Sequence, residues 1–244
     1  MPVITDFEEY RQLREELFQS SQWQLKSDIN NLGISKFIFD QNYYDLKRLA
    51  LAFAEPKFAI EVSRVGNEEK MKIVHRTFVR LLHNYLASAH SLIEHSQVFK
   101  NKYYNDHDFK QEYQDKITSH FDNSQLAHFI KELRHYIIHK GLPITSARIQ
   151  FGRDKEFDSS IMLHINEMRE WSGWTSKSTE FMKALNDKIK IYDIVDSYWN
   201  LVGEFYDWFG QKQDEIHAEE FSFIRNTIDE LIRFENNGMK RPIQ

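Results

Sequence analysis

The sequence predicts an all-α protein, a helical bundle with a small β-hairpin insert and a C-terminal helical extension. Three observations support this fold class. The 244 residues include only 8 Gly and 4 Pro, so the residues that interrupt helices are rare. Apolar residues recur at spacings of three and four over long stretches, as on the buried face of a helix. One segment, residues 144–166, instead alternates partly with a period of two around a glycine-containing turn.

Residues 1–66 form the first of four expected segments, and it is helical. Residues 6–21 and 41–54 each carry an apolar stripe and are expected to form two separate helices. Between them, the Asp-, Asn- and Gly-containing residues 28–33 predict a turn. Residues 58–62, with the sequence Phe-Ala-Ile-Glu-Val, are interpreted as a short strand.

Residues 67–143 form the second segment, which is the expected helical core. A long helix is predicted over about 67–102, and a shorter one over about 108–120. A third helix should follow a capping side chain, Asn123 or Ser124, which can accept a hydrogen bond from a free amide of the first turn.

This third helix is expected to end at Gly141. A glycine can adopt the left-handed conformation that follows the last turn, and Pro143 two residues later cannot continue the helix. The last turns of the helix therefore fall on the residues around His139.

Residues 144–166 are the predicted hairpin, with strands at 144–151 and 160–165. An isolated hairpin is marginal in water, so it must pack on the helices or on a partner chain. Residues 167–244 are the aromatic-rich helical extension, with a helical pattern from Ile189 that is expected to break near Gly210. Aromatic residues at helical spacing indicate a core or an interface, although exposed ones could also stack on bases. We expect the four segments to form one compact unit.

Polar side chains interrupt the apolar face at the end of the third core helix. Arg134, His135 and His139 lie among Leu133, Ile137 and Ile138. The pattern Arg134-His135-x-x-x-His139 resembles the Arg-polar-x3-His signature of HEPN domains (higher eukaryotes and prokaryotes nucleotide-binding). These are all-helical modules, and many of them are metal-independent ribonucleases in toxin–antitoxin and antiphage systems.

Two further segments resemble a group of bacterial HEPN-like proteins. They are Lys140-Gly141-Leu142-Pro143, at the end of the signature helix, and His83-Asn84-Tyr85, on the long helix. The resemblance covers residues 68–143. It implies a HEPN-like helical bundle, a homodimer whose two chains build a composite site, and an endoribonuclease that cleaves RNA through attack of its own 2′-hydroxyl.

The resemblance assigns a role to each residue of the motif. Arg134 would bind phosphate, His139 would do the acid–base chemistry and His135 would support the site. The side-chain chemistry is compatible with these roles, because histidine exchanges protons near neutral pH and arginine offers a fork of donors to phosphate oxygens. Arg134 and His139 are five residues apart, so they point in directions about 140° apart on one helix. A second copy of the helix could bring an Arg and a His from each chain into one groove.

Three other interpretations stay open. His135 and His139 have the i, i+4 spacing of a metal-binding pair, with a third ligand from the long helix such as His83 or His90. Alternatively, Arg134 could anchor a buried carboxylate such as Glu94, and the histidines could cap carbonyls at the helix end. Finally, the protein could be a non-catalytic helical module that binds a nucleotide or another protein.

The composition narrows the chemistry. The absence of cysteine excludes disulfides, thiol nucleophiles and Cys-ligated zinc, and it fits a reducing compartment. There is no Gly-rich phosphate loop, and no motif points to an organic cofactor, so we expect neither a cofactor nor a metal. The net charge of −5 argues against coating of nucleic acid by bulk charge. Residues 131–155, however, contain six Lys or Arg and only two acidic residues, Glu132 and Asp154.

The expected location is the cytoplasm, without a membrane. Residues 1–30 lack the basic, apolar and small-residue pattern of a signal peptide. No apolar run approaches the roughly 18 residues that a membrane-spanning helix needs. The expected partners are a second copy of the chain, RNA and, if the protein is a toxin, an antitoxin protein.

Overall fold

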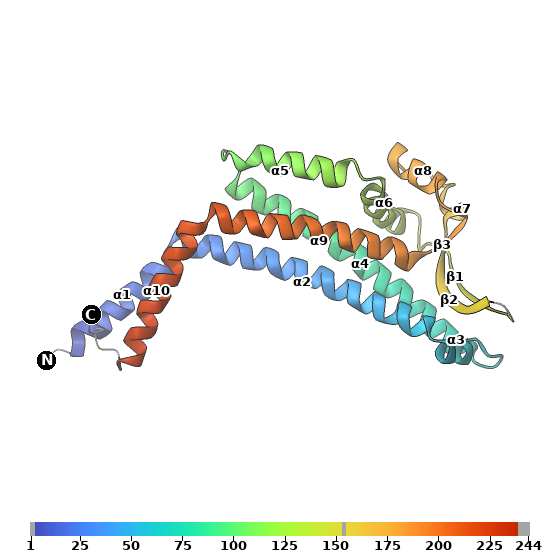
Figure 1. Cartoon of the computed structure of the whole chain (residues 1–244), viewed down its shortest axis with the longest axis horizontal. Coiled ribbons are helices and arrows are strands. Elements are labelled where there is room, and N and C mark those ends of the chain that lie inside the picture. Colours follow the sequence, from blue (N-terminus) through green and yellow to red (C-terminus); the bar gives the residue numbers. More distant parts are fainter. Residues whose placement is uncertain (1–2, 153–154, 239–244) are drawn as a thin grey trace. The chain divides into compact units, whose positions relative to one another are not determined.

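The structure, a computed structural model, describes residues 3–152 and 155–238 (Figure 1). It is 78% helical and contains one small three-stranded antiparallel sheet. The predicted mostly helical class and the β-hairpin insert are therefore confirmed. Within the described ranges, no helix combines the length and the apolar character that crossing a membrane requires.

The chain divides into two compact units, where we had expected one. The first comprises Met1–Ile34 and Tyr206–Gln244, and the second comprises Ser35–Phe205. Two long helices, α2 (Ser21–Ala54) and α9 (Ile191–Ile216), contribute residues to both units. The predicted signature helix and the hairpin belong to the second unit.

In the first unit, α1 (Val3–Gln19) packs against α10 (Ala218–Asn236). Their contact is a cluster of buried apolar residues, Leu17, Ile224 and Leu231. The Tyr10 hydroxyl adds a hydrogen bond of 2.7 Å to the Glu235 carboxylate.

The expected helix break near Gly210 is wrong. Helix α9 continues to Ile216, and the break falls at His217. Phe205, Phe209 and Gln213 are all buried, so one continuous packed face crosses the glycine. That packing outweighs the intrinsic cost of about 1 kcal/mol for a glycine inside a helix.

The predicted turn at residues 28–33 is also wrong, because α2 is one continuous helix from Ser21 to Ala54. Five buried residues spaced seven apart form an unbroken stripe along it: Leu25, Leu32, Phe39, Leu46 and Phe53. A seven-residue apolar repeat keeps one face of a helix buried over its whole length. Packing of this stripe overrides the local preference of Asn30, Asn31 and Gly33 for a turn.

Residues 58–62 are helical and not a strand, since they lie within α3 (Pro56–Ser63). Pro56 occupies the first helical position, where its missing N–H costs nothing. Ala59 and Val62, three residues apart, are the buried positions. In this short segment the buried side chains have the three-residue spacing of a helix, and this outweighs the preference of the residues for a strand.

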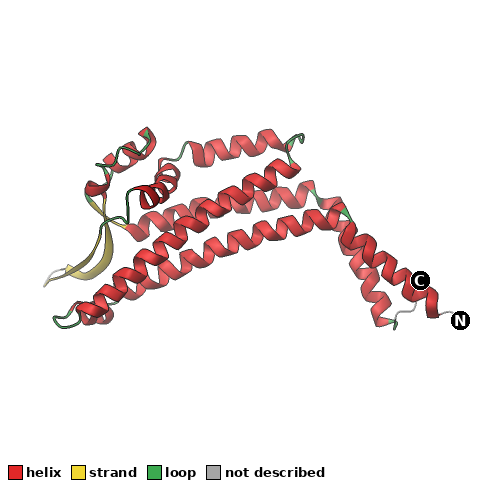
Figure 2. Ribbon diagram, turned by 180° about the vertical axis from the view of Figure 1, so that it is seen from behind, coloured by secondary structure: helices red, strands yellow, loops and turns green. Residues whose placement is uncertain are grey.

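The predicted long helix is confirmed as α4 (Glu68–Tyr103), which forms the centre of the second unit. Figures 1 and 2 show it beside α2 and α9. The Phe39 ring of α2 lies 5.1 Å from the Tyr85 ring of α4, centroid to centroid, and the Tyr85 hydroxyl donates to the Val195 carbonyl of α9 at 3.1 Å. On α9, Trp199 stacks on Tyr43 of α2 at 4.4 Å. Aromatic residues of the C-terminal extension thus serve as core, as expected.

The predicted shorter helix is present as α5 (Phe109–Ile117), followed by a π-helical turn, η1 (Thr118–Asp122). This segment is held against α9 by a ring contact between Tyr113 and Phe205. In addition, the His120 ring binds the Leu201 carbonyl at 2.8 Å.

The sheet has the order β1-β2-β3, with β1 (Thr145–Gly152) and β2 (Lys155–His164) forming the predicted hairpin. A third strand that was not predicted, β3 (Lys188–Lys190), pairs antiparallel with the end of β2. Three residues are too few to display a period of two. The hairpin packs on the helices through Ile149 and Ile161, which cover Phe53, Val62 and Val74. Short helices α7 (Ile165–Met168) and α8 (Ser176–Lys183) lie between β2 and β3 in the chain.

Candidate functional site

The helix that carries the motif is α6 (Gln125–His139), and both of its predicted ends are confirmed. The Ser124 hydroxyl caps the start by accepting a hydrogen bond from the Ala127 amide at 3.2 Å. At the other end, Gly141 has a φ of +136°, and the amides of Lys140 and Gly141 both donate to the Tyr136 carbonyl. His139 is therefore the last residue of the helix.

One side of α6 is anchored in the second unit. The buried Tyr136 ring stacks on Trp174 at 5.6 Å and meets the edge of Trp171 at 5.4 Å. Glu132 is buried as well, and its carboxylate accepts a hydrogen bond from the Thr175 amide at 2.8 Å. Of the two acidic residues in the basic stretch 131–155, Glu132 is therefore part of the core.

Arg134 lies half-buried on α6, and its positive charge acts on His90 of α4. Within the described part of the chain, its guanidinium has neither a hydrogen bond nor an ion pair. Burial and then the positive charge of Arg134 lower the pKa of His90, and His135 and Lys131 act in the same direction. The Glu94 carboxylate, 3.8 Å from the His90 ring nitrogen, opposes them.

His135 is the residue of the motif whose ring contacts His139. The rings of His135 and His139 lie 6.3 Å apart, centroid to centroid, with an interplanar angle of 77°. His135 is half-buried, whereas His139 is exposed. Arg134 and His135 are thus half-buried and act electrostatically on His90, whereas His139 is exposed. The structure gives no contact between Arg134 and His139 within one described chain.

This geometry bears on two of the open interpretations, the Arg134–Glu94 ion pair and the metal site. The Glu94 carboxylate pairs with His90, and the described residues form no ion pair between Glu94 and Arg134. Among the described residues, no three His, Asp or Glu side chains are grouped so that they could hold a metal ion. His83, one of the suggested third ligands, is exposed on α4.

Most of the other histidines in residues 75–139 have structural roles. Five of them bind to other elements or to turns: His75 to Thr145, His95 to Ser35, His107 to the Phe109 amide, His120 to the Leu201 carbonyl and His128 to the Asp122 carbonyl. In the His83-Asn84-Tyr85 segment, Tyr85 is a core residue whose burial raises its pKa well above the ordinary value.

The basic character of the site extends along the following strand only in part. Arg148 is exposed on β1 and donates to Gln150. Arg153 lies outside the described residues, as does the side chain of Lys155.

A second basic region, which was not predicted, lies on α4. Residues 70–93 contain four Lys or Arg and three His but no Asp or Glu. This run without an acidic residue is visible in the sequence and could have indicated the basic region.

A comparison of the chain with protein-family models, with curated proteins and with solved structures finds no match. Any functional conclusion therefore depends on the chemistry of the site. Among the described residues the Arg134 guanidinium has no ion pair, so it is available to an anion such as phosphate, and histidine is a residue type that serves in acid–base chemistry.

Proposed function

We propose that this protein is a HEPN-like, metal-independent endoribonuclease that works as a homodimer. The observation that carries the proposal is the state of Arg134. It is half-buried within electrostatic range of His90, and no described carboxylate lies within ion-pair distance of it. A structural arginine in such a position would normally have an acidic partner, because a charge removed from water must be compensated. A bound phosphate would supply that compensation.

The reaction requires three groups. A base removes the proton of a 2′-hydroxyl, whose oxygen attacks the adjacent phosphorus. An acid then protonates the departing 5′-oxygen, so that one strand ends in a 2′,3′-cyclic phosphate and the other in a 5′-hydroxyl. In this proposal His139 is the proton-transfer group, because its ring is exposed and can reach a substrate. Arg134 stabilises the extra negative charge of the pentacoordinate phosphorus.

A second chain is needed because Arg134 and His139 diverge on one helix. Exposed apolar side chains around the end of α6 support contact with such a copy. Ile138, Leu142 and Ile144 are 52%, 60% and 50% exposed. Isologous packing of these residues about a two-fold axis would place the two α6 ends opposite each other. His139 of one chain would then work with Arg134 of its partner.

The decisive test is cleavage of a labelled single-stranded RNA in the presence of EDTA. Wild type is compared with Arg134→Ala and His139→Ala, and His128→Ala on the same helix serves as the control. We expect cleavage that survives chelation, produces 2′,3′-cyclic phosphate ends and is lost only in the first two variants. A folded wild-type protein that cuts no member of a broad RNA panel would sink the nuclease proposal and favour the non-catalytic binding module.

The dimer is tested separately, by sedimentation velocity. The double variant Ile138→Asp/Leu142→Asp should sediment as a monomer and lose cleavage while staying folded. If wild type is a monomer that still cleaves, the composite site is wrong. A toxin or antiphage role follows from the HEPN resemblance alone. It predicts that expression of wild type, but not of His139→Ala, arrests the growth of a host that lacks an antitoxin.

A further inference from the structure

Helix α4 has an exposed cationic face, which we call the α4 basic face. It consists of Lys72, Arg76, Arg80, His83 and His90. At 100° per residue these five positions fall within a sector of about 80°. The first four are exposed and His90 is half-buried. No acidic residue occurs in the sequence between Glu69 and Glu94, and these two carboxylates lie near the end members of the face, Lys72 and His90.

The cations of this face are available to a ligand. Arg76 and Arg80 make no hydrogen bond or ion pair with the described residues. Lys72 pairs with Glu69 at 2.6 Å, but both side chains are more than half exposed. Exposed pairs of this kind contribute little and exchange readily for another anion.

At its C-terminal end, the α4 basic face comes within electrostatic range of the proposed catalytic group. Its C-terminal member, His90, is the residue whose pKa is lowered by burial and by Arg134. From Lys72 to His90 the helix advances 18 residues, or about 27 Å along its axis. That length exceeds what one phosphate needs, and it suits a strand of several nucleotides.

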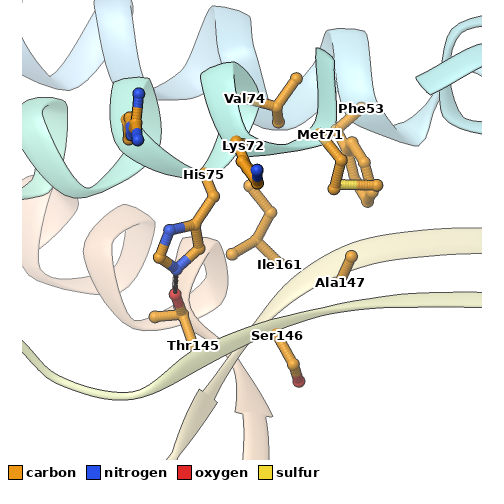
Figure 3. A pocket seen from close by; sticks show the side chains of 10 residues that line it. Phe53, Met71, Lys72, Val74, His75, Thr145, Ser146, Ala147 and Ile161 are labelled. Atoms are coloured by element: carbon orange, nitrogen blue, oxygen red, sulfur yellow. Dashed lines mark hydrogen bonds between the residues drawn. The ribbon is translucent and has the colours of Figure 1, made fainter. Parts of the chain in front are cut away.

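The other end of the face borders a pocket between α4 and the hairpin (Figure 3). The pocket has a volume of about 310 Å³, and its apolar lining includes Phe53, Met71 and Ile161. Lys72 and Arg76 of the basic face also line it. On one side, the His75 ring meets the Thr145 hydroxyl at 2.7 Å, as the dashed line in Figure 3 shows. An apolar cavity beside two cations suits a flat, unstacked base whose phosphate stays outside.

We propose that the α4 basic face carries the backbone of a single-stranded RNA from this pocket to Arg134 and His135. This inference rests on the proposed function, because it extends the same site. Single strands bind proteins through cationic grooves that follow the backbone and through pockets or rings that hold individual bases. A duplex has no unstacked base to offer the pocket, so it binds more weakly than the single strand.

The test is binding of wild-type protein to a single-stranded RNA with 2′-O-methyl groups, which cannot supply the attacking hydroxyl. Fluorescence anisotropy is measured over a series of salt concentrations. The variant is Arg76→Gln/Arg80→Gln, and the control is Arg225→Gln/Arg233→Gln on exposed positions of α10. Both double variants change the net charge equally. Each lost phosphate contact lowers the slope of log K against log salt by about 0.7.

We expect the α4 variant to flatten this slope by about 1.4 and the control to leave it unchanged. Ala147→Phe fills the pocket from an exposed position of β1 and should weaken binding without a change in slope. If the α4 variant and the control have equal slopes, the inference is wrong. If Ala147→Phe binds RNA with full affinity, the pocket does not hold a base. Cleavage of unmodified RNA separates the two proposals. If wild type cleaves RNA but the salt slopes of the α4 variant and the control are equal, only the RNA-path inference is wrong. If the slopes differ as expected but wild type does not cleave, only the nuclease proposal is wrong.

Discussion

The imidazole rings of His135 and His139 lie 6.3 Å apart and nearly perpendicular in the last turn of α6. His135 is half-buried and, like Arg134, acts electrostatically on His90, whereas His139 is exposed. One ring of the pair is therefore partly withdrawn from solvent and the other is open to it. In the proposed mechanism this difference in exposure separates a supporting residue from a proton-transfer residue.

The two histidines should differ in how much their removal costs. His139→Ala should lower kcat for RNA cleavage by about 10²–10⁴-fold, the usual contribution of a positioned acid or base. His135→Ala should cost less, and His135→Gln should recover part of the loss because it keeps a polar group in place. Single-turnover kinetics with a defined RNA measure both. Equal losses in His135→Ala and His139→Ala, with no recovery in His135→Gln, would contradict the division of roles.

Stability should fall in mild acid because two half-buried histidines resist protonation. Burial, then Arg134, His135 and Lys131, lower the pKa of His90 against the opposing Glu94, while burial and Lys188 lower the pKa of His164 against Glu167. The unfolded chain therefore binds more protons than the folded one, and the free energy of unfolding decreases as pH falls below about 6.5. Urea unfolding at a series of pH values should show a smaller decrease in His90→Gln.

The contribution of Arg134 to this effect can be isolated. Arg134→Gln removes a positive charge that acts on His90, so the pKa of His90 should rise towards its ordinary value. A proton NMR titration of the His90 ring gives the shift directly. Arg225→Gln on α10 serves as the charge-matched control and should leave the titration unchanged. If Arg134→Gln also leaves it unchanged, the two side chains do not interact as described.

Glu132 should be a stability determinant. Its buried carboxylate accepts a hydrogen bond from the Thr175 amide and so ties α6 to the loop before α8. Glu132→Ala leaves that amide without this acceptor and should lower the free energy of unfolding by about 1–3 kcal/mol. Glu132→Gln keeps an acceptor oxygen and should lose less. Urea denaturation compares the three proteins, and equal stability of Glu132→Ala and wild type would exclude a structural role.

Two glycines should respond in opposite ways to alanine. Gly33 lies inside α2 with open space around an added Cβ, so Gly33→Ala should stabilise the protein by about 0.5–1 kcal/mol. Gly141 ends α6 at a φ of +136°, where an alanine is strained, so Gly141→Ala should destabilise by about 1–3 kcal/mol. Thermal unfolding of both variants checks the signs. Destabilisation by Gly33→Ala would indicate that residues 28–33 do form a turn.

Local signals predicted the ends of α6 but not the continuity of α2. Ser124 and Gly141 act through the hydrogen bonds and dihedral angles of their own neighbourhood, so sequence suffices to locate them. Residues 28–33 have a local preference for a turn that packing of Leu25, Leu32 and Phe39 overrides. The strand β3 was missed for a related reason, since its three residues are defined by pairing with β2.

The sequence suggests the members of the candidate site but not their surroundings. The roles of Arg134, His135 and His139 come from their spacing and from the HEPN resemblance, and they stay a prediction. The approach of His90 depends on how α4 and α6 pack, which no spacing within either helix specifies. Similarly, the sequence shows Glu132 only as one of two acidic residues in the basic stretch 131–155, whereas the fold buries it next to Thr175.

By itself, the sequence determined the helical class, the hairpin and the last turn of α6. Each of these depends on patterns only a few residues long, such as an apolar period, a cap or a glycine. Tertiary structure alone decided which side chains from distant elements share one surface. Arg134 of α6 acts on His90 of α4 because helices pack through their apolar faces, and that packing fixes which polar residues of the two helices come near each other.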